Sequence, residues 1–196
     1  MIQKKSVAAK TVRLILTVWL LLAFVVGGIG WLRPAPAPLI AVTVAVLTAS
    51  ALAACRKIDA ISQWLGAADL RRLVSLHLTR FVGIYFLVLS HRGELNSAFA
   101  RPAGFGDCIV AAGALLLLIF WGHLNGNVLL LVWNTFGILD ILLVVGLALR
   151  VGLQDWISMA PLRELPLSLL PTFLVPLIIV SHIFIFMKVA RSNTAR

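Results

Sequence analysis

Six apolar segments follow one another along the chain, separated by short polar or charged stretches. A membrane-spanning helix needs about 20 predominantly apolar residues, with a range of about 17–25. We expect such helices at residues 14–31, 38–55, 73–90, 107–123, 127–149 and 165–187. The segments are apolar on every face, so they lack the alternating polarity of membrane β-strands. The pattern predicts an all-α integral membrane protein, a six-helix transmembrane bundle forming a single domain over residues 1–196.

The polar connections refine this prediction at two places. Residues 56–72 carry Ile61 and Leu65 at helical spacing between basic ends, which predicts an interfacial segment lying along the membrane surface. The connection after the third segment contains Pro102 and several glycines, which predicts an irregular loop. The fourth segment is therefore expected to begin only at Asp107, with Asp107 and His123 at its two membrane interfaces.

The composition agrees with a lipid environment. Hydrophobic residues make up 61% of the chain and charged residues only 12%, whereas a soluble domain has about 45–50% apolar and about 25% charged residues. A soluble fold of this size could not cover so much apolar surface. Lipid is therefore the expected partner of most of the surface, and either homo-oligomers or a partner membrane subunit are compatible with it.

The distribution of positive charge predicts the orientation. Eleven of the 17 Lys and Arg residues lie at the two chain ends and in the second connection, five lie in the alternate connections, and one lies inside an apolar segment. Because basic residues concentrate on the cytoplasmic side, both termini are expected to be cytoplasmic, and the protein is expected in a bacterial cytoplasmic (inner) membrane. The eleven are Lys4, Lys5, Lys10, Arg13, Arg56, Lys57, Arg71, Arg72, Lys188, Arg191 and Arg196. No basic stripe interleaved with exposed aromatic residues supports a nucleic-acid partner.

Two formal charges lie well inside the predicted spans. A rise of about 1.5 Å per residue puts Arg80 roughly 12 Å and Asp140 roughly 20 Å from the cytoplasmic end of their helices. They therefore lie on either side of the midplane of a hydrocarbon core about 30 Å thick. Charged residues in spans normally face the protein interior and find partners. We expect Arg80 and Asp140 to form an ion pair.

Two histidines suggest a second feature of the same region. His77 precedes Arg80 by three residues, so both lie on one face of a helix. His77 and His182 lie at similar depths, roughly 8 and 9 Å from the cytoplasmic boundary, and Asn134 lies near that level. Two histidines on different helices could ligate haem iron. One hypothesis is therefore a haem b-binding membrane electron carrier with His77 and His182 as iron ligands.

The remaining hypotheses use the same residues differently. His77, Arg80, Asn134, Asp140 and His182 could form a buried site that binds a small ligand or relays protons or ions. The cluster could instead be structural, in an accessory subunit of a membrane complex. The chain contains no recognisable catalytic motif, such as a nucleophile elbow, a metalloprotease helix or a phosphate-binding loop. Enzymatic activity therefore has no support from the sequence.

Overall fold

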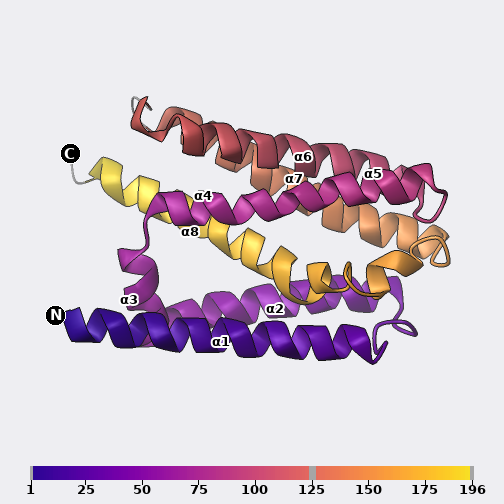
Figure 1. Ribbon diagram of the computed structural model, residues 1–196, viewed down its shortest axis with the longest axis horizontal. Coiled ribbons are helices and arrows are strands. Elements are labelled where there is room, and N and C mark those ends of the chain that lie inside the picture. Colours follow the sequence, from indigo (N-terminus) through magenta and orange to yellow (C-terminus); the bar gives the residue numbers. More distant parts are fainter. Residues whose placement is uncertain (1, 124–126, 195–196) are drawn as a thin grey trace. The chain divides into compact units, whose positions relative to one another are not determined.

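The computed structural model describes residues 2–123 and 127–194, which form helices joined by short links (Figure 1). Within these ranges there is no strand, and six helical stretches are long and apolar enough to cross a membrane. This confirms the all-α class and the number of predicted spans. The six stretches are Val7–Gly28, Ala37–Lys57, Leu70–His91, Ser97–Ile119, Val128–Gln154 and Leu170–Arg191. The cytoplasmic position of both termini stays a prediction, and residues 124–126 and Arg196, which it assigns to that side, lie outside the described residues.

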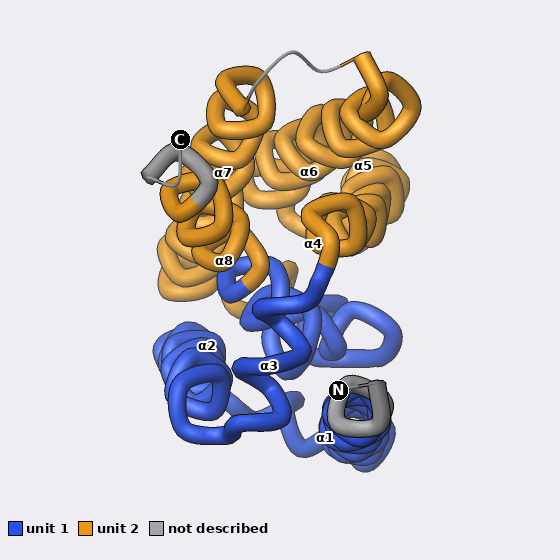
Figure 2. The backbone as a smooth tube through the Cα atoms, turned by 90° about the vertical axis from the view of Figure 1, so that its left-hand side faces the viewer, with its two compact units in different colours: residues 1–68, 161–180 blue, residues 69–160, 181–196 orange. Residues whose placement is uncertain are grey.

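The chain divides into two compact units, residues 1–68 with 161–180 and residues 69–160 with 181–196 (Figure 2). We call them unit 1 and unit 2. Each has its own internal packing, and the single domain predicted over residues 1–196 stays a prediction.

Unit 1 contains α1 (Ile2–Gly28), α2 (Ala37–Lys57) and the short α3 (Asp59–Ala67), which packs against both. α1 ends where Gly30 adopts a left-handed φ of +70°. There the Trp31 N–H donates to the Val26 carbonyl across 3.2 Å, which is the bond that closes a helix through a C-terminal glycine. The α3 residues Ile61 and Leu65 are buried, while the interfacial position of residues 56–72 stays a prediction.

Two prolines shape the last span inside unit 1. Instead of one helix over residues 165–187, the structure has a π-helical turn, η4 (Leu170–Leu174), followed by α8 (Val175–Thr194). Pro176 has no N–H to donate to the Thr172 carbonyl one turn earlier. That carbonyl instead accepts a hydrogen bond from Trp19 Nε1 of α1 across 2.9 Å. Pro176 therefore leaves the Thr172 carbonyl available to accept the hydrogen bond from α1.

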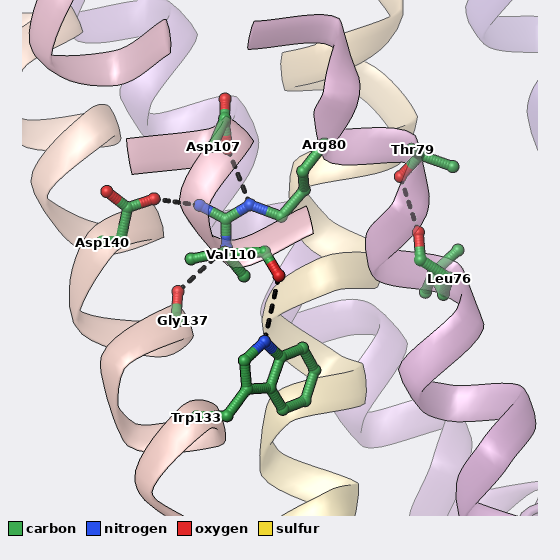
Figure 3. Close-up of polar contacts among 8 residues, drawn as sticks. All are labelled: Leu76, Thr79, Arg80, Asp107, Val110, Trp133, Gly137 and Asp140. Carbon is green, nitrogen blue, oxygen red and sulfur yellow. Dashed lines mark hydrogen bonds and ion pairs between the residues drawn. The ribbon is translucent and has the colours of Figure 1, made fainter. Parts of the chain in front are cut away.

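In unit 2 the third span is interrupted at the position of its polar residues. It runs as α4 (Leu70–Leu76), the 3-10 helix η1 (His77–Val82) and α5 (Gly83–His91). Hydroxyl groups bond to carbonyls three residues earlier, as from Thr79 to Leu76 across 2.7 Å (Figure 3), which competes with regular α-helical bonding. In a 3-10 helix residues i and i+3 eclipse each other. His77 and Arg80 therefore lie on one face, and both are buried.

The fourth span corrects the prediction of an irregular loop. α6 extends over Ser97–Ile119, so residues 97–106 are helical. The Asn96 side chain starts this helix by accepting a hydrogen bond from the Ala98 N–H across 3.0 Å. Pro102 is accommodated inside α6, as prolines often are in membrane helices. Asp107 consequently lies within the helix and is buried, and its expected place at a membrane interface is wrong.

A polar cluster holds the start of α6 against the end of α7 (Val128–Gln154). Asn96 donates from Nδ2 to Ser158 Oγ across 3.0 Å and to Asp155 Oδ2 across 3.2 Å. The hydrogen bonds from the Ser158 side chain and N–H lower the pKa of Asp155, because they favour the carboxylate form. This cluster fixes where α6 begins, and therefore the depth at which Asp107 lies.

The apolar core of unit 2 lies between α4, α6, α7 and the second part of α8. After α6 the chain passes through the 3-10 turn η2 (Trp121–His123) before α7 begins. The core residues are Leu73, Val74, Val110, Ala114, Leu117, Leu130, Trp133, Ile185 and Val189. Apolar packing therefore surrounds the place where the buried polar residues of this unit meet.

Candidate functional site

Arg80 is the centre of a buried charged cluster in unit 2 (Figure 3). Its Nε donates to Asp107 Oδ1 across 2.6 Å, its Nη2 donates to Asp140 Oδ2, and its Nη1 donates to the Gly137 carbonyl across 3.0 Å. Only 1% of the Arg80 surface is exposed, compared with 4% for Asp107 and 7% for Asp140. The cluster therefore contains the predicted Arg80–Asp140 pair together with a second acid.

Glycine residues, which have no side chain, make room for this cluster. A Cβ atom built on Gly106 would collide with the Asp140 carboxylate, so that carboxylate lies directly against the backbone of α6. A Cβ atom on Gly137 would lie 2.5 Å from Cε1 and 3.0 Å from Nε2 of His182. Gly137 therefore contacts both halves of the site, Arg80 through its carbonyl and His182 through its Cα.

Asn134 orients the imidazole of His182. The Asn134 Nδ2 donates to the His182 carbonyl across 3.0 Å, which leaves Oδ1 as the atom 2.8 Å from His182 Nδ1. An amide oxygen only accepts hydrogen bonds, so His182 carries its proton on Nδ1 in this arrangement. Nε2 then presents a lone pair toward Gly137. Both Asn134 and His182 are fully buried.

His77 lies against His182 with ring centroids 4.2 Å apart. Its Nε2 is 3.0 Å from the hydroxyl of Ser181, and its ring meets the Trp133 indole edge-on at a centroid distance of 5.0 Å. The indole Nε1 donates to the Val110 carbonyl across 3.0 Å (Figure 3). These contacts fix the position of the histidine pair.

Two ring nitrogens of the pair lack hydrogen-bond partners. His77 Nδ1 and His182 Nε2 are buried and have no acceptor or donor among the described residues. Most buried polar atoms have a partner, so these two nitrogens are exceptions that can still take up a hydrogen bond. The structure thus brings together all five residues that the sequence singled out, and their role as a ligand or proton site stays a prediction.

The histidine pair does not fit the haem hypothesis in this arrangement. Bis-histidine ligation places the two imidazoles on opposite faces of a porphyrin. Here the two rings lie in direct contact, with their centroids 4.2 Å apart. No macrocycle fits between rings in contact. Within residues 2–123 and 127–194 there is also no group of three or more His, Cys, Asp or Glu side chains suited to a metal ion.

Sequence reasoning missed Asp107 and Ser181. The sequence predicts Asp107 at an interface because Pro102 and the nearby glycines resemble loop residues. A helical signal was nevertheless present: Phe99, Ala103, Asp107 and Ala111 recur at a spacing of four, and all are buried in α6. Ser181 immediately precedes His182, and no pattern in the sequence distinguishes it from other serines.

Comparison with known proteins places the chain in a family. No curated protein matches the sequence. No solved structure matches it. A family model described as a domain of unknown function (DUF8737) matches residues 37–190, which cover α2 to α7 and most of α8 and include every residue of the site. Because the match extends over most of the sequence, the chain belongs to the DUF8737 family.

Proposed function

We propose that this membrane protein handles protons: the Arg80–Asp107–Asp140 cluster takes up and releases a proton, and the His77–His182 pair is the next acceptor. The observation that carries the proposal is the charge balance of the cluster. One guanidinium faces two carboxyl groups, and all three are buried in spans. Arginine stays protonated in proteins, so the cluster has a negative charge unless a proton or cation compensates it.

The energetic reason is the low dielectric of the membrane. One uncompensated charge at the centre of a span costs about 2.5–3.5 kcal/mol on insertion scales. A single proton on one carboxyl group removes that charge and leaves the Arg80 bonds to the other one in place. The cluster therefore has two states that differ by one proton.

The histidine pair adds an acceptor beside Gly137, the residue that also binds Arg80. His182 Nε2 has a lone pair and no partner, and it lies at Gly137, the residue whose carbonyl binds Arg80. Imidazole is suited to proton transfer because its two nitrogens can exchange donor and acceptor roles. The second candidate function is binding of a small polar ligand at the two unpaired nitrogens, His77 Nδ1 and His182 Nε2.

The compensating proton should be visible by infrared spectroscopy. At neutral pH, where exposed carboxyl groups are ionised, we expect the purified protein to show a C=O band from a protonated carboxyl group. The band should disappear in Asp107→Asn/Asp140→Asn and persist in the control Asp155→Asn, because Asp155 lies outside the spans. A wild-type spectrum without this band contradicts a proton-compensated cluster.

Proton movement is measured in sealed vesicles containing a pH-sensitive dye. Vesicles with the wild-type protein are expected to lose an imposed pH gradient faster than protein-free vesicles. Asp140→Asn should reduce the rate to that of protein-free vesicles, and Asp155→Asn should leave it unchanged. Equal rates for wild type and Asp140→Asn would contradict the proton relay and favour the ligand-binding hypothesis.

The orientation predicted from the distribution of basic residues has its own test. With both termini on the cytoplasmic side of a bacterial inner membrane, reporters inserted after Arg33, Glu94 and Arg163 should all report the periplasmic side, because these residues lie in alternate links. Glu94 is chosen because it precedes α6. A cytoplasmic signal from the Glu94 insertion would reverse the orientation of the third and fourth spans.

A further inference from the structure

Unit 1 contains an apolar cavity of its own. Its volume is about 580 Å³, within the range of about 300–1,000 Å³ typical of small-molecule sites. It is lined by residues of α1, of α2, of the link between them and of η4. Trp19 and Ala23 contribute from α1, Leu39 and Leu47 from α2, and Thr172 from η4.

Three of the polar side chains in the cavity wall are already bonded. Trp19 Nε1 donates to the Thr172 carbonyl, and the Thr172 hydroxyl donates to the Ser168 carbonyl across 2.7 Å. The Thr43 hydroxyl donates to the Leu39 carbonyl across 2.8 Å. The cavity therefore presents mainly hydrocarbon, which suits an apolar guest because these three side chains keep their hydrogen bonds on binding.

The cavity runs along the membrane depth. Leu39 and Leu47 are eight residues apart in α2, a distance of roughly 12 Å along the helix. Trp31, at the mouth of the cavity, has 68% of its surface exposed and lies just beyond the end of α1. Tryptophan at this position is typical of the boundary between lipid and water. A guest would therefore extend from the headgroup level into the hydrocarbon core.

The mouth carries a net positive charge. Arg33 lies between the lining residues Leu32 and Pro34, and its side chain is 67% exposed. Arg163 donates from Nη1 to the Arg33 carbonyl across 2.6 Å. Glu164 pairs with Arg33 at 3.1 Å, so two guanidinium groups and one carboxylate leave one positive charge. Guanidinium groups bind phosphate well because their donors match its oxygens.

From this combination we propose that the cavity of unit 1 binds one acyl chain of an anionic membrane phospholipid. The lipid phosphate would be held at the mouth by Arg33 and Arg163. The apolar wall suits the acyl chain of such a lipid, and the positive mouth suits its anionic headgroup. The cavity also extends in the direction along which the lipid lies in the membrane. The proposal is independent of the proton-handling site in unit 2.

Native mass spectrometry of the full-length protein tests it. The protein in detergent is incubated with equal amounts of phosphatidylglycerol and phosphatidylcholine that carry the same acyl chains. We expect phosphatidylglycerol to be retained about fivefold over phosphatidylcholine, the effect of one positive charge near a membrane surface. Arg33→Gln/Arg163→Gln should abolish this preference, while the control Arg92→Gln, an exposed arginine of unit 2, should keep it.

Two further variants test the part of the cavity that would hold the acyl chain. Ala23→Phe and Thr43→Phe place a ring in the cavity and should lower retention of both lipids, whereas Ala53→Phe, on the exposed side of α2, should not. Equal retention of both lipids by the wild type overturns the proposal, as does an unchanged preference in Arg33→Gln/Arg163→Gln. A dimer that buries Trp31 and retains no lipid also overturns it, because a second copy then covers the cavity. Displacement of the lipid by glycerol phosphate alone overturns the role of the acyl chain.

Discussion

Replacing Arg80 with methionine is expected to lower the free energy of unfolding by about 3–5 kcal/mol, the usual loss when one partner of a buried ion pair is removed. The change leaves Asp107 and Asp140 buried without their shared donor. It also leaves the Gly137 carbonyl without the Nη1 bond. The measurement is thermal unfolding in detergent, combined with the yield of monodisperse protein. Arg92→Met, at an exposed position, is the matched control and should resemble wild type.

The recovery pattern tests the three-residue cluster. Arg80→Met/Asp140→Leu still leaves Asp107 buried and unpaired, so we expect little recovery. Arg80→Met/Asp107→Leu/Asp140→Leu removes all three charges and should regain most of the loss, because well-packed apolar residues can replace buried ion pairs. If the double variant recovers as much as the triple one, Asp107 is not an energetic partner of Arg80.

The second large effect is expected at Gly83. A Cβ atom there would lie 2.5 Å from the Gly104 carbonyl oxygen and 2.8 Å from the Asp107 Cβ. Because the nearest obstacle is the α6 backbone, Gly83→Ala should force α5 and α6 apart and shift Asp107 relative to Arg80. Overpacking of this kind costs about 1–3 kcal/mol, and sometimes more. The measurement is the unfolding temperature in detergent.

Gly146→Ala is the matched control for this substitution. Gly146 lies in α7, and a Cβ atom there meets nothing within 4 Å. Alanine is preferred over glycine in helices by about 0.8–1.0 kcal/mol, so this variant should be as stable as wild type or slightly more stable. A Gly83→Ala protein as stable as Gly146→Ala would contradict the close contact between α5 and α6.

The spans were predictable from the sequence because lipid imposes a simple requirement. Any helix that crosses the hydrocarbon core needs a long apolar stretch, and six such stretches are visible without a structure. The pairing of Arg80 with Asp140 was accessible for a related reason: helix rise gives depth, and two opposite charges at neighbouring depths stabilise each other.

The missed parts depend on contacts between helices. Gly104 and Gly106 resemble loop residues in the sequence, but in the structure they allow Gly83 and Asp140 to approach the α6 backbone. Without that knowledge α6 was expected to start at Asp107, and the second acid of the cluster was assigned to the membrane surface. Depth alone also could not give the 3-10 geometry of η1, where local hydroxyl bonds such as the one from Thr79 to Leu76 compete with α-helical bonding.

The order of synthesis imposes a delay on this protein. Arg80 leaves the ribosome before both of its acids, and Asp140 follows it by 60 residues. At about 5–20 residues per second, roughly 3–12 s pass before Asp140 is even made. During that time the third span carries an arginine whose insertion alone is unfavourable. The apolar residues of the span must offset this cost until Asp107 and Asp140 arrive, so the third span reaches its full stability only after sequence far downstream of it has been made.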